Sequence, residues 1–236
     1  MKKIKGMAIA LLLIQLTACK DHLPIEGTPE HYALHGVVND GKTINEIKLF
    51  DPRIVLPVRL RFPADTWIGV TTEGWNDRPP VIIRKGYATT LLTSKTFDEN
   101  KKLVNVNEKK PDATVTIYFR TSNHKATPAD YGTGSSSKNY EREIKEWGVI
   151  ESVRKRGEEI EGRFVYLPIE ASFHAKNAEP VWMNCNASGK VPASCHGYFQ
   201  QRGLSVEFHF DYRLMPQWRE IYIGISEFTD GVIVQN

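Results

Sequence analysis

Apolar and polar residues alternate over much of this chain. In the segment 206–212, Val206, Phe208 and Phe210 fall on one face and Glu207 and His209 on the other. A period of two is typical of a half-buried β-strand. The same alternation recurs in four further segments: 54–62, 113–119, 165–169 and 221–225. We therefore expect five strands with one face toward a core.

Turn-forming residues separate these segments. They include Asn39-Asp40-Gly41, the Pro-containing stretch 76–80 and the Gly157 region. Short strands with turns between them are typical of antiparallel all-β domains. The prediction is a mainly β fold, an antiparallel β-sandwich or barrel-like domain with at most one or two short helices.

Three segments depart from the alternation. Residues 98–112 are rich in lysine, asparagine and glutamate, and residues 127–139 contain two glycines and three serines. Both compositions predict exposed loops, and the second is a possible subdomain boundary. In 140–153, Tyr140, Ile144 and Trp147 suit a helix, whereas Gly148 and the apolar residues after it suit a strand. We expect a short helix or helical turn followed by a strand, with an all-strand alternative left open.

The N-terminus has a different pattern. Three lysines precede the apolar run Met7–Leu16, which is too short to cross a hydrocarbon core of about 30 Å as a helix. This layout predicts a targeting peptide. The run ends in Leu16-Thr17-Ala18-Cys19, which resembles the lipobox of bacterial lipoproteins.

This resemblance implies cleavage after residue 18 and acylation of Cys19, including palmitate. Residues 19–30 would then form a lipidated tether and residues 31–236 an all-β periplasmic domain. Lys20, and not an aspartate, follows the cysteine, which favours the outer membrane, with the domain on the periplasmic face. Three acyl chains exceed the two signals that stable anchoring needs.

Removal of the signal peptide also changes the charge. Three of the 31 basic residues lie in it, so the mature chain carries 28 basic and 28 acidic residues. A formally neutral chain gives no electrostatic reason to expect nucleic acid as a partner.

Cys185 and Cys195 remain once Cys19 is acylated. An even pair in an oxidising compartment predicts a disulfide. The alternative, a metal site of both cysteines with His196, lacks a clear fourth ligand and the usual cysteine spacing. We therefore predict no metal site.

The segment Gly36–Thr43 satisfies the Walker A pattern. A phosphate-binding loop needs a buried strand before it and a helix after it, but Pro52 follows closely and the surrounding pattern is all-β. We expect a turn here, with no nucleotide and no cofactor.

Catalytic motifs are also weak. Two Ser-x-x-Lys matches, at Ser135 and Ser152, lack the companion motifs of penicillin-binding enzymes. Among seven histidines, His31 and His35 would share a face only in a helix. His209 lies on the polar side of a predicted strand, where we expect a solvated or cross-strand role. The sequence predicts no catalytic residues, and therefore a protein that is not an enzyme.

Residues that bind a partner form weaker sequence patterns than catalytic residues do. Four tryptophans near predicted turns or strand ends are candidate interface anchors, although they could equally fill the ends of the core: Trp67, Trp75, Trp182 and Trp218. The general layout resembles immunity lipoproteins, which neutralise periplasm-acting toxins such as phospholipase effectors. The alternative is a structural or assembly lipoprotein of an envelope secretion or conjugation complex.

Overall fold

The computed structural model describes residues 25, 28–50, 57–71, 87–88, 90–98, 102–106, 114–121, 138–156, 159–170, 173, 181–188 and 191–234. Its helices are α1 (Pro29–His35), the 3-10 helix η3 (Tyr212–Gln217) and α2 (Trp218–Val232). Its strands are β1 (Asn45–Leu49), β2 (Val58–Phe62), β3 (Gly69–Thr71), β4 (Tyr87–Ala88), β5 (Thr90–Phe97), β6 (Leu103–Asn105), β7 (Thr114–Thr121), β8 (Lys138–Ile144), β9 (Val149–Arg156), β10 (Glu159–Pro168), β11 (Trp182–Ser188), β12 (Val191–Gln201) and β13 (Leu204–Asp211).

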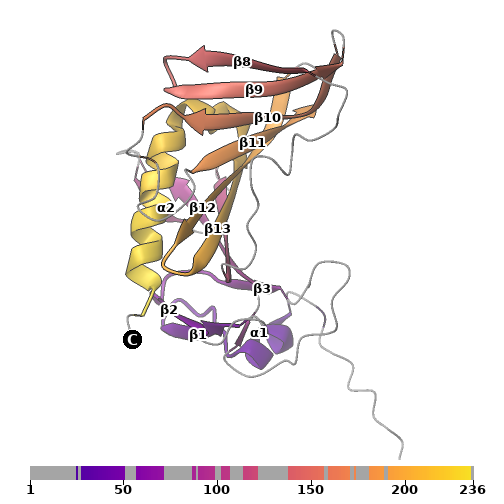
Figure 1. Cartoon of the computed structure of the whole chain (residues 1–236). Coiled ribbons are helices and arrows are strands. Elements are labelled where there is room, and N and C mark those ends of the chain that lie inside the picture. Colours follow the sequence, from indigo (N-terminus) through magenta and orange to yellow (C-terminus); the bar gives the residue numbers. More distant parts are fainter. Residues whose placement is uncertain are drawn as a thin grey trace, which may run out of the picture.

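Ten of these strands form one large antiparallel sheet. Nine of them follow the order β3-β5-β7-β13-β12-β11-β10-β9-β8, and β6 pairs with β5. The sheet is strongly twisted, and strands β8–β11 lie at the opposite end of the molecule from β1, β2 and α1 (Figure 1). The predicted mainly β, antiparallel fold is confirmed.

A smaller sheet, β2-β1-β4, shares its core with the large one. The ring of Phe62 on β2 lies 5.8 Å from that of Phe119 on β7. Helix α2 packs along the same face of the large sheet (Figure 1) and contributes Trp218, Ile221 and Ile225 to the shared core. We call this the inner face and the opposite one the outer face.

The predicted strand at 221–225 is wrong, because these residues belong to α2. The buried residues of this helix recur every three or four positions: Trp218, Ile221, Ile225, Thr229 and Val232. Ile223, between two buried isoleucines, is 45% exposed. The alternating isoleucines are therefore part of a helical period of 3.6.

The predicted helix in 140–153 is also wrong, whereas the strand after it is confirmed. Residues 138–144 form β8, which pairs with β9 around a turn in which Gly148 has φ of 62°. Tyr140 lies opposite Val153 and Ile144 opposite Val149, so their spacing reflects one face of a strand. The expected loop 98–112 likewise contains a strand, β6.

The Walker A match has a structural explanation. It joins α1 to β1, which is helix–loop–strand and not the strand–loop–helix of a phosphate site. Gly36 caps α1 with φ of 73°. The Asp40 carboxylate accepts hydrogen bonds from the backbone N–H groups of Lys42 and Thr43, and these bonds lower its pKa.

The signal peptide, Cys19 and residues 127–137 of the proposed boundary lie outside the described residues. None of the helices in the described part of the chain has the length and apolar character needed to cross a membrane.

Candidate functional site

Strands β11, β12 and β13 carry a disulfide on one face of the large sheet and a group of polar side chains on the other. Cys185 on β11 lies opposite Cys195 on β12, and a disulfide joins them at the inner face. Both cysteines are fully buried. The predicted pairing is confirmed, and the bond links two paired strands.

The next residue, His196, points to the outer face because side chains alternate along a strand. It lies directly opposite His209 on β13. The two imidazole rings stack, with centroids 3.9 Å apart and planes 29° from parallel. The cross-strand role expected for His209 is therefore confirmed.

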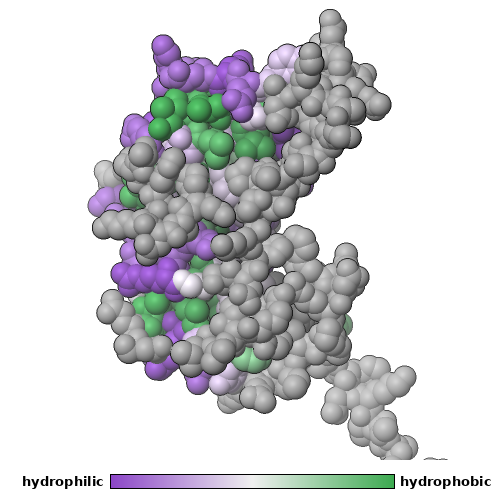
Figure 2. Space-filling model, viewed as in Figure 1, coloured by the Kyte–Doolittle hydropathy of each residue, from purple (hydrophilic) through white to green (hydrophobic). Residues whose placement is uncertain are grey.

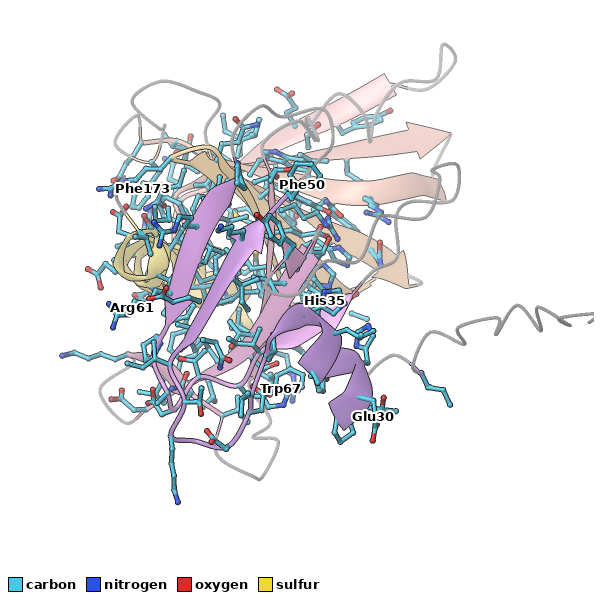
Figure 3. All side chains as sticks on the ribbon, turned by 90° about the horizontal axis from the view of Figure 1, so that it is seen from below. Glu30, His35, Phe50, Arg61, Trp67 and Phe173 are labelled. Carbon is cyan, nitrogen blue, oxygen red and sulfur yellow. A yellow bond between two sulfur atoms is a disulfide. The ribbon has the colours of Figure 1, made fainter. Side chains whose placement is uncertain are left out.

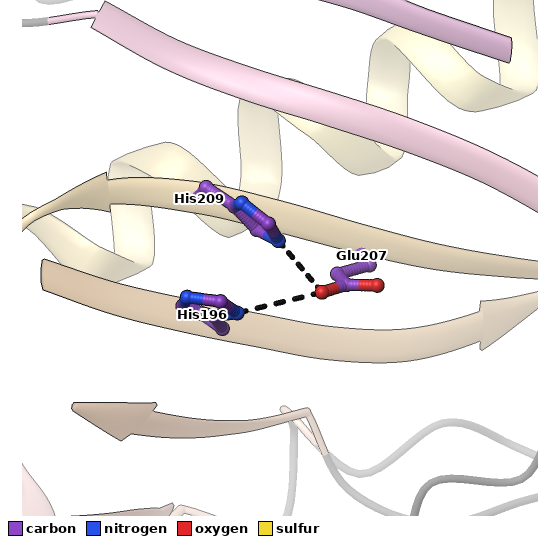
Figure 4. Close-up of side chains that lie close together, drawn as sticks. All are labelled: His196, Glu207 and His209. Atoms are coloured by element: carbon purple, nitrogen blue, oxygen red, sulfur yellow. Dashed lines mark hydrogen bonds and ion pairs between the residues drawn. The ribbon is translucent and has the colours of Figure 1, made fainter. Parts of the chain in front are cut away.

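Both imidazoles contact the carboxylate of Glu207, two residues before His209 on the same strand (Figure 4). Nε2 of His209 lies 2.6 Å from Oε1 of Glu207, and Nδ1 of His196 lies 3.4 Å from the same oxygen. We call His196, Glu207 and His209 the histidine–glutamate cluster.

Two further side chains hold Glu207 from neighbouring strands. Arg120 on β7 donates to Oε2, and the Tyr198 hydroxyl on β12 donates to Oε1 over 3.1 Å. Burial alone would raise the pKa of Glu207. The hydrogen bonds with His196 and His209 and the charge of Arg120 outweigh burial, so the pKa lies well below its ordinary value. Glu207 is therefore an ionised carboxylate with fixed partners.

Aromatic rings flank the cluster. The ring of Tyr118 lies 4.5 Å from that of His209, and Tyr198 stacks on Trp182 at 4.5 Å. Trp182, Tyr198 and Val165 form a small apolar group of their own on the outer face, with Leu167 packed against it. Figure 2 shows apolar side chains gathered over the end formed by β8–β11, bordered by hydrophilic ones.

The candidate tryptophans have different environments. Trp67 is 47% exposed, and its ring lies 6.4 Å from that of Tyr32 in α1 (Figure 3). Trp182 and Trp218 are buried, which fits the alternative of a packing role. Trp75 lies outside the described residues.

The structure also places the other two candidate ligand sets. His31 and His35 do share a face, because residues 29–35 are helical, and their rings lie 5.1 Å apart. His35 Nδ1 lies 2.7 Å from the carbonyl oxygen of Tyr87, which fits a packing role. The set of Cys185, Cys195 and His196 does not form, because the cysteines are paired at the inner face and His196 lies at the outer face.

Sequence reasoning missed the histidine–glutamate cluster. It considered His196 only as a ligand beside the two cysteines, whereas His196 lies inside the eleven-residue strand β12. The sequence signal available for the cluster was Glu207-x-His209 on the polar side of a predicted strand. The third member, His196, could be added only from the register between β12 and β13, which the sequence does not reveal.

No protein-family model matches this chain, and no curated protein matches it in sequence. Its fold is similar to that of a solved structure, an immunity protein of the Stenotrophomonas maltophilia type IV secretion system. The two share 11% sequence identity with a TM-score of 0.50, over 82% of this chain and 94% of the other. At this identity the similarity shows the fold alone, which this chain therefore shares with a protein that has an immunity role.

Proposed function

We propose that this protein is a lipid-anchored immunity protein that faces the periplasm, binds a toxin acting there, and neutralises it without chemistry of its own. The observation that carries the proposal is the fold similarity, which extends over 94% of a secretion-system immunity protein. The lipobox-like Leu16-Thr17-Ala18-Cys19 adds independent support, because an anchored inhibitor would meet its toxin at the membrane.

The described surface supports a role in protein binding. Asn39 hydrogen-bonds both the N–H and the carbonyl group of Ile68, which brings the loop after α1 against the segment before β3. Val38 and Trp67, which adjoin these two residues, are 45% and 47% exposed. A half-exposed tryptophan beside an apolar neighbour is a typical anchor of a protein interface. Trp67 is therefore the tryptophan that we propose as a contact to the toxin.

A periplasm-acting hydrolase, such as a phospholipase, is the toxin class we propose. Such an enzyme is neutralised when a binding protein covers its active site. The binding protein then needs a complementary surface of standard interface size.

The test is an affinity pull-down of the lipidated protein from detergent-solubilised envelopes of its native host. Mass spectrometry then identifies the proteins that co-purify with it. We expect one stoichiometric partner with hydrolase motifs, whose purified activity falls when this protein is added. Co-purification of several envelope subunits would instead support an assembly role, and absence of any partner would contradict the proposal.

A second measurement tests the anchor. We expect the wild-type protein to carry acyl chains at Cys19 and to fractionate with the outer membrane. The Cys19→Ser variant should lose both properties while its β domain still folds. An acylated wild-type protein in the inner membrane would contradict the location but not the anchor.

A further inference from the structure

We propose that the histidine–glutamate cluster binds one divalent transition-metal ion of the zinc class at the outer face of the large sheet. The proposal rests on His196 Nδ1, Glu207 Oε1 and His209 Nε2. It departs from the sequence-based expectation of no metal site, because only the β12–β13 register brings these three groups together.

The spacing of the three groups fits a metal centre. In the described part of the chain, the cluster is the one group of three potential ligands whose ligand atoms all lie within 4.8 Å of one another. Zinc binds imidazole nitrogen and carboxylate oxygen at about 2.0–2.2 Å, so two ligands of a tetrahedral ion lie roughly 3.4 Å apart. The His196–Glu207 separation is 3.4 Å and the His209–Glu207 separation 2.6 Å. Small side-chain rotations would admit an ion.

The ligand types also suit this class of ion. Imidazole and carboxylate together favour zinc and its neighbours over calcium or magnesium, which prefer oxygen alone. A neutral imidazole can present either nitrogen as the ligand by moving its proton to the other one. His209 would coordinate through Nε2 and His196 through Nδ1.

The surrounding residues prepare the carboxylate for this role. Arg120 binds Oε2 of Glu207 and leaves Oε1 facing the two imidazoles, while Tyr198 donates to Oε1 from β12. Outer contacts of this kind fix the orientation of a ligating carboxylate. Because Arg120 also offsets the charge of Glu207, we expect moderate affinity for a cation.

The cluster is open to an ion from solution. The side chains of His196 and His209 are 21% and 32% exposed, whereas that of Glu207 is 11% exposed. Three protein ligands leave a fourth position for water or another ligand. This is the arrangement of sites that exchange a ligand, in contrast to closed structural sites.

Isothermal titration of the untagged protein with zinc chloride at neutral pH tests the proposal. We expect one ion per chain, with an affinity that falls at least about tenfold in His196→Gln and in His209→Gln, since even outer contacts of metal sites are worth 10–100-fold. The matched control is His22→Gln, which removes an imidazole from the predicted tether and should leave the affinity unchanged.

A second measurement on the wild-type protein does not depend on how the variants fold. Cobalt(II) should bind with a visible spectrum typical of nitrogen and oxygen ligands, and zinc should displace it. Absence of zinc binding up to about 1 mM, which marks weak affinity, would overturn the proposal. Zinc binding that persists unchanged in both folded histidine variants would overturn it as well. Neither result would affect the proposed immunity role.

Discussion

Cys185 and Cys195 lie directly opposite each other on β11 and β12, and their disulfide crosses the hairpin at the inner face. The next residue on β12 is His196 of the outer-face cluster. The bond therefore ties β12, the strand that carries His196, to β11, whereas the pairing of His196 with His209 is set by the separate register between β12 and β13.

Replacement of both cysteines by alanine should destabilise the protein. Their sequence separation is 10 residues, and the chain-entropy model gives a loop of this size roughly 2.5–3 kcal/mol of stabilisation. Denaturant unfolding of the double variant and of the oxidised wild type measures the difference. Reductant should destabilise the wild type and leave the double variant unchanged. Equal stability of the two oxidised proteins would contradict this expectation.

The charge of Glu207 should make stability depend on pH. Its pKa is lowered in the folded protein, so the ionised form favours folding. This contribution is complete above the ordinary pKa of 4.5 and is lost as the pH falls below it. Glu207→Gln should thus be less stable than wild type at pH 7, and the gap should narrow in acid.

Thermal unfolding from pH 7 to pH 3 provides this comparison. Glu141→Gln, which changes an exposed glutamate of β8, is the matched control and should follow the wild-type curve. Parallel curves for Glu207→Gln and wild type across the whole range would show that the carboxylate charge contributes no pH dependence.

Two glycines should respond in opposite directions to alanine. A Cβ at Gly197 would lie 2.0 Å from the buried ring of Phe208, its cross-strand partner, so Gly197→Ala should cost about 1–3 kcal/mol. A Cβ at Gly231 in α2 would meet nothing within 4 Å. Gly231→Ala should stabilise by about 0.5 kcal/mol, since glycine is a poor helix former. Unfolding free energies of the two variants measure both effects, and a neutral Gly197→Ala would contradict the close packing.

Hydrophobic alternation predicted the fold class because most central strands have one buried and one polar face. It predicted β7 and β13 correctly. It failed at Ile221 and Ile225, because residues four apart share a face in a helix as well as in a strand. Strand β8 has only Ile144 buried among its described side chains, so its sequence lacks the alternation of apolar and polar residues that marks a half-buried strand.

The candidate site was harder to predict than the fold. The disulfide followed from the lipobox resemblance, because assigning Cys19 to acylation leaves two cysteines in an oxidising compartment, and two cysteines allow one pairing. The histidine–glutamate cluster needed a non-local fact, the position of His196 opposite His209. A shift of one residue would have turned His196 to the inner face.

A core tryptophan and a surface tryptophan should respond differently to substitution by alanine. Trp218 is fully buried, and its Nε1 donates to the carbonyl oxygen of Trp147 over 2.8 Å, so Trp218→Ala should cost about 3–5 kcal/mol. Trp67 is half exposed, and Trp67→Ala should change stability by only about 0.5 kcal/mol. Under the proposed function, Trp67→Ala should also weaken binding to the captured partner by about tenfold or more. Ile223→Ala, at a similarly exposed position on α2, is the control and should bind normally. Full affinity of a folded Trp67→Ala variant would place the partner on another surface.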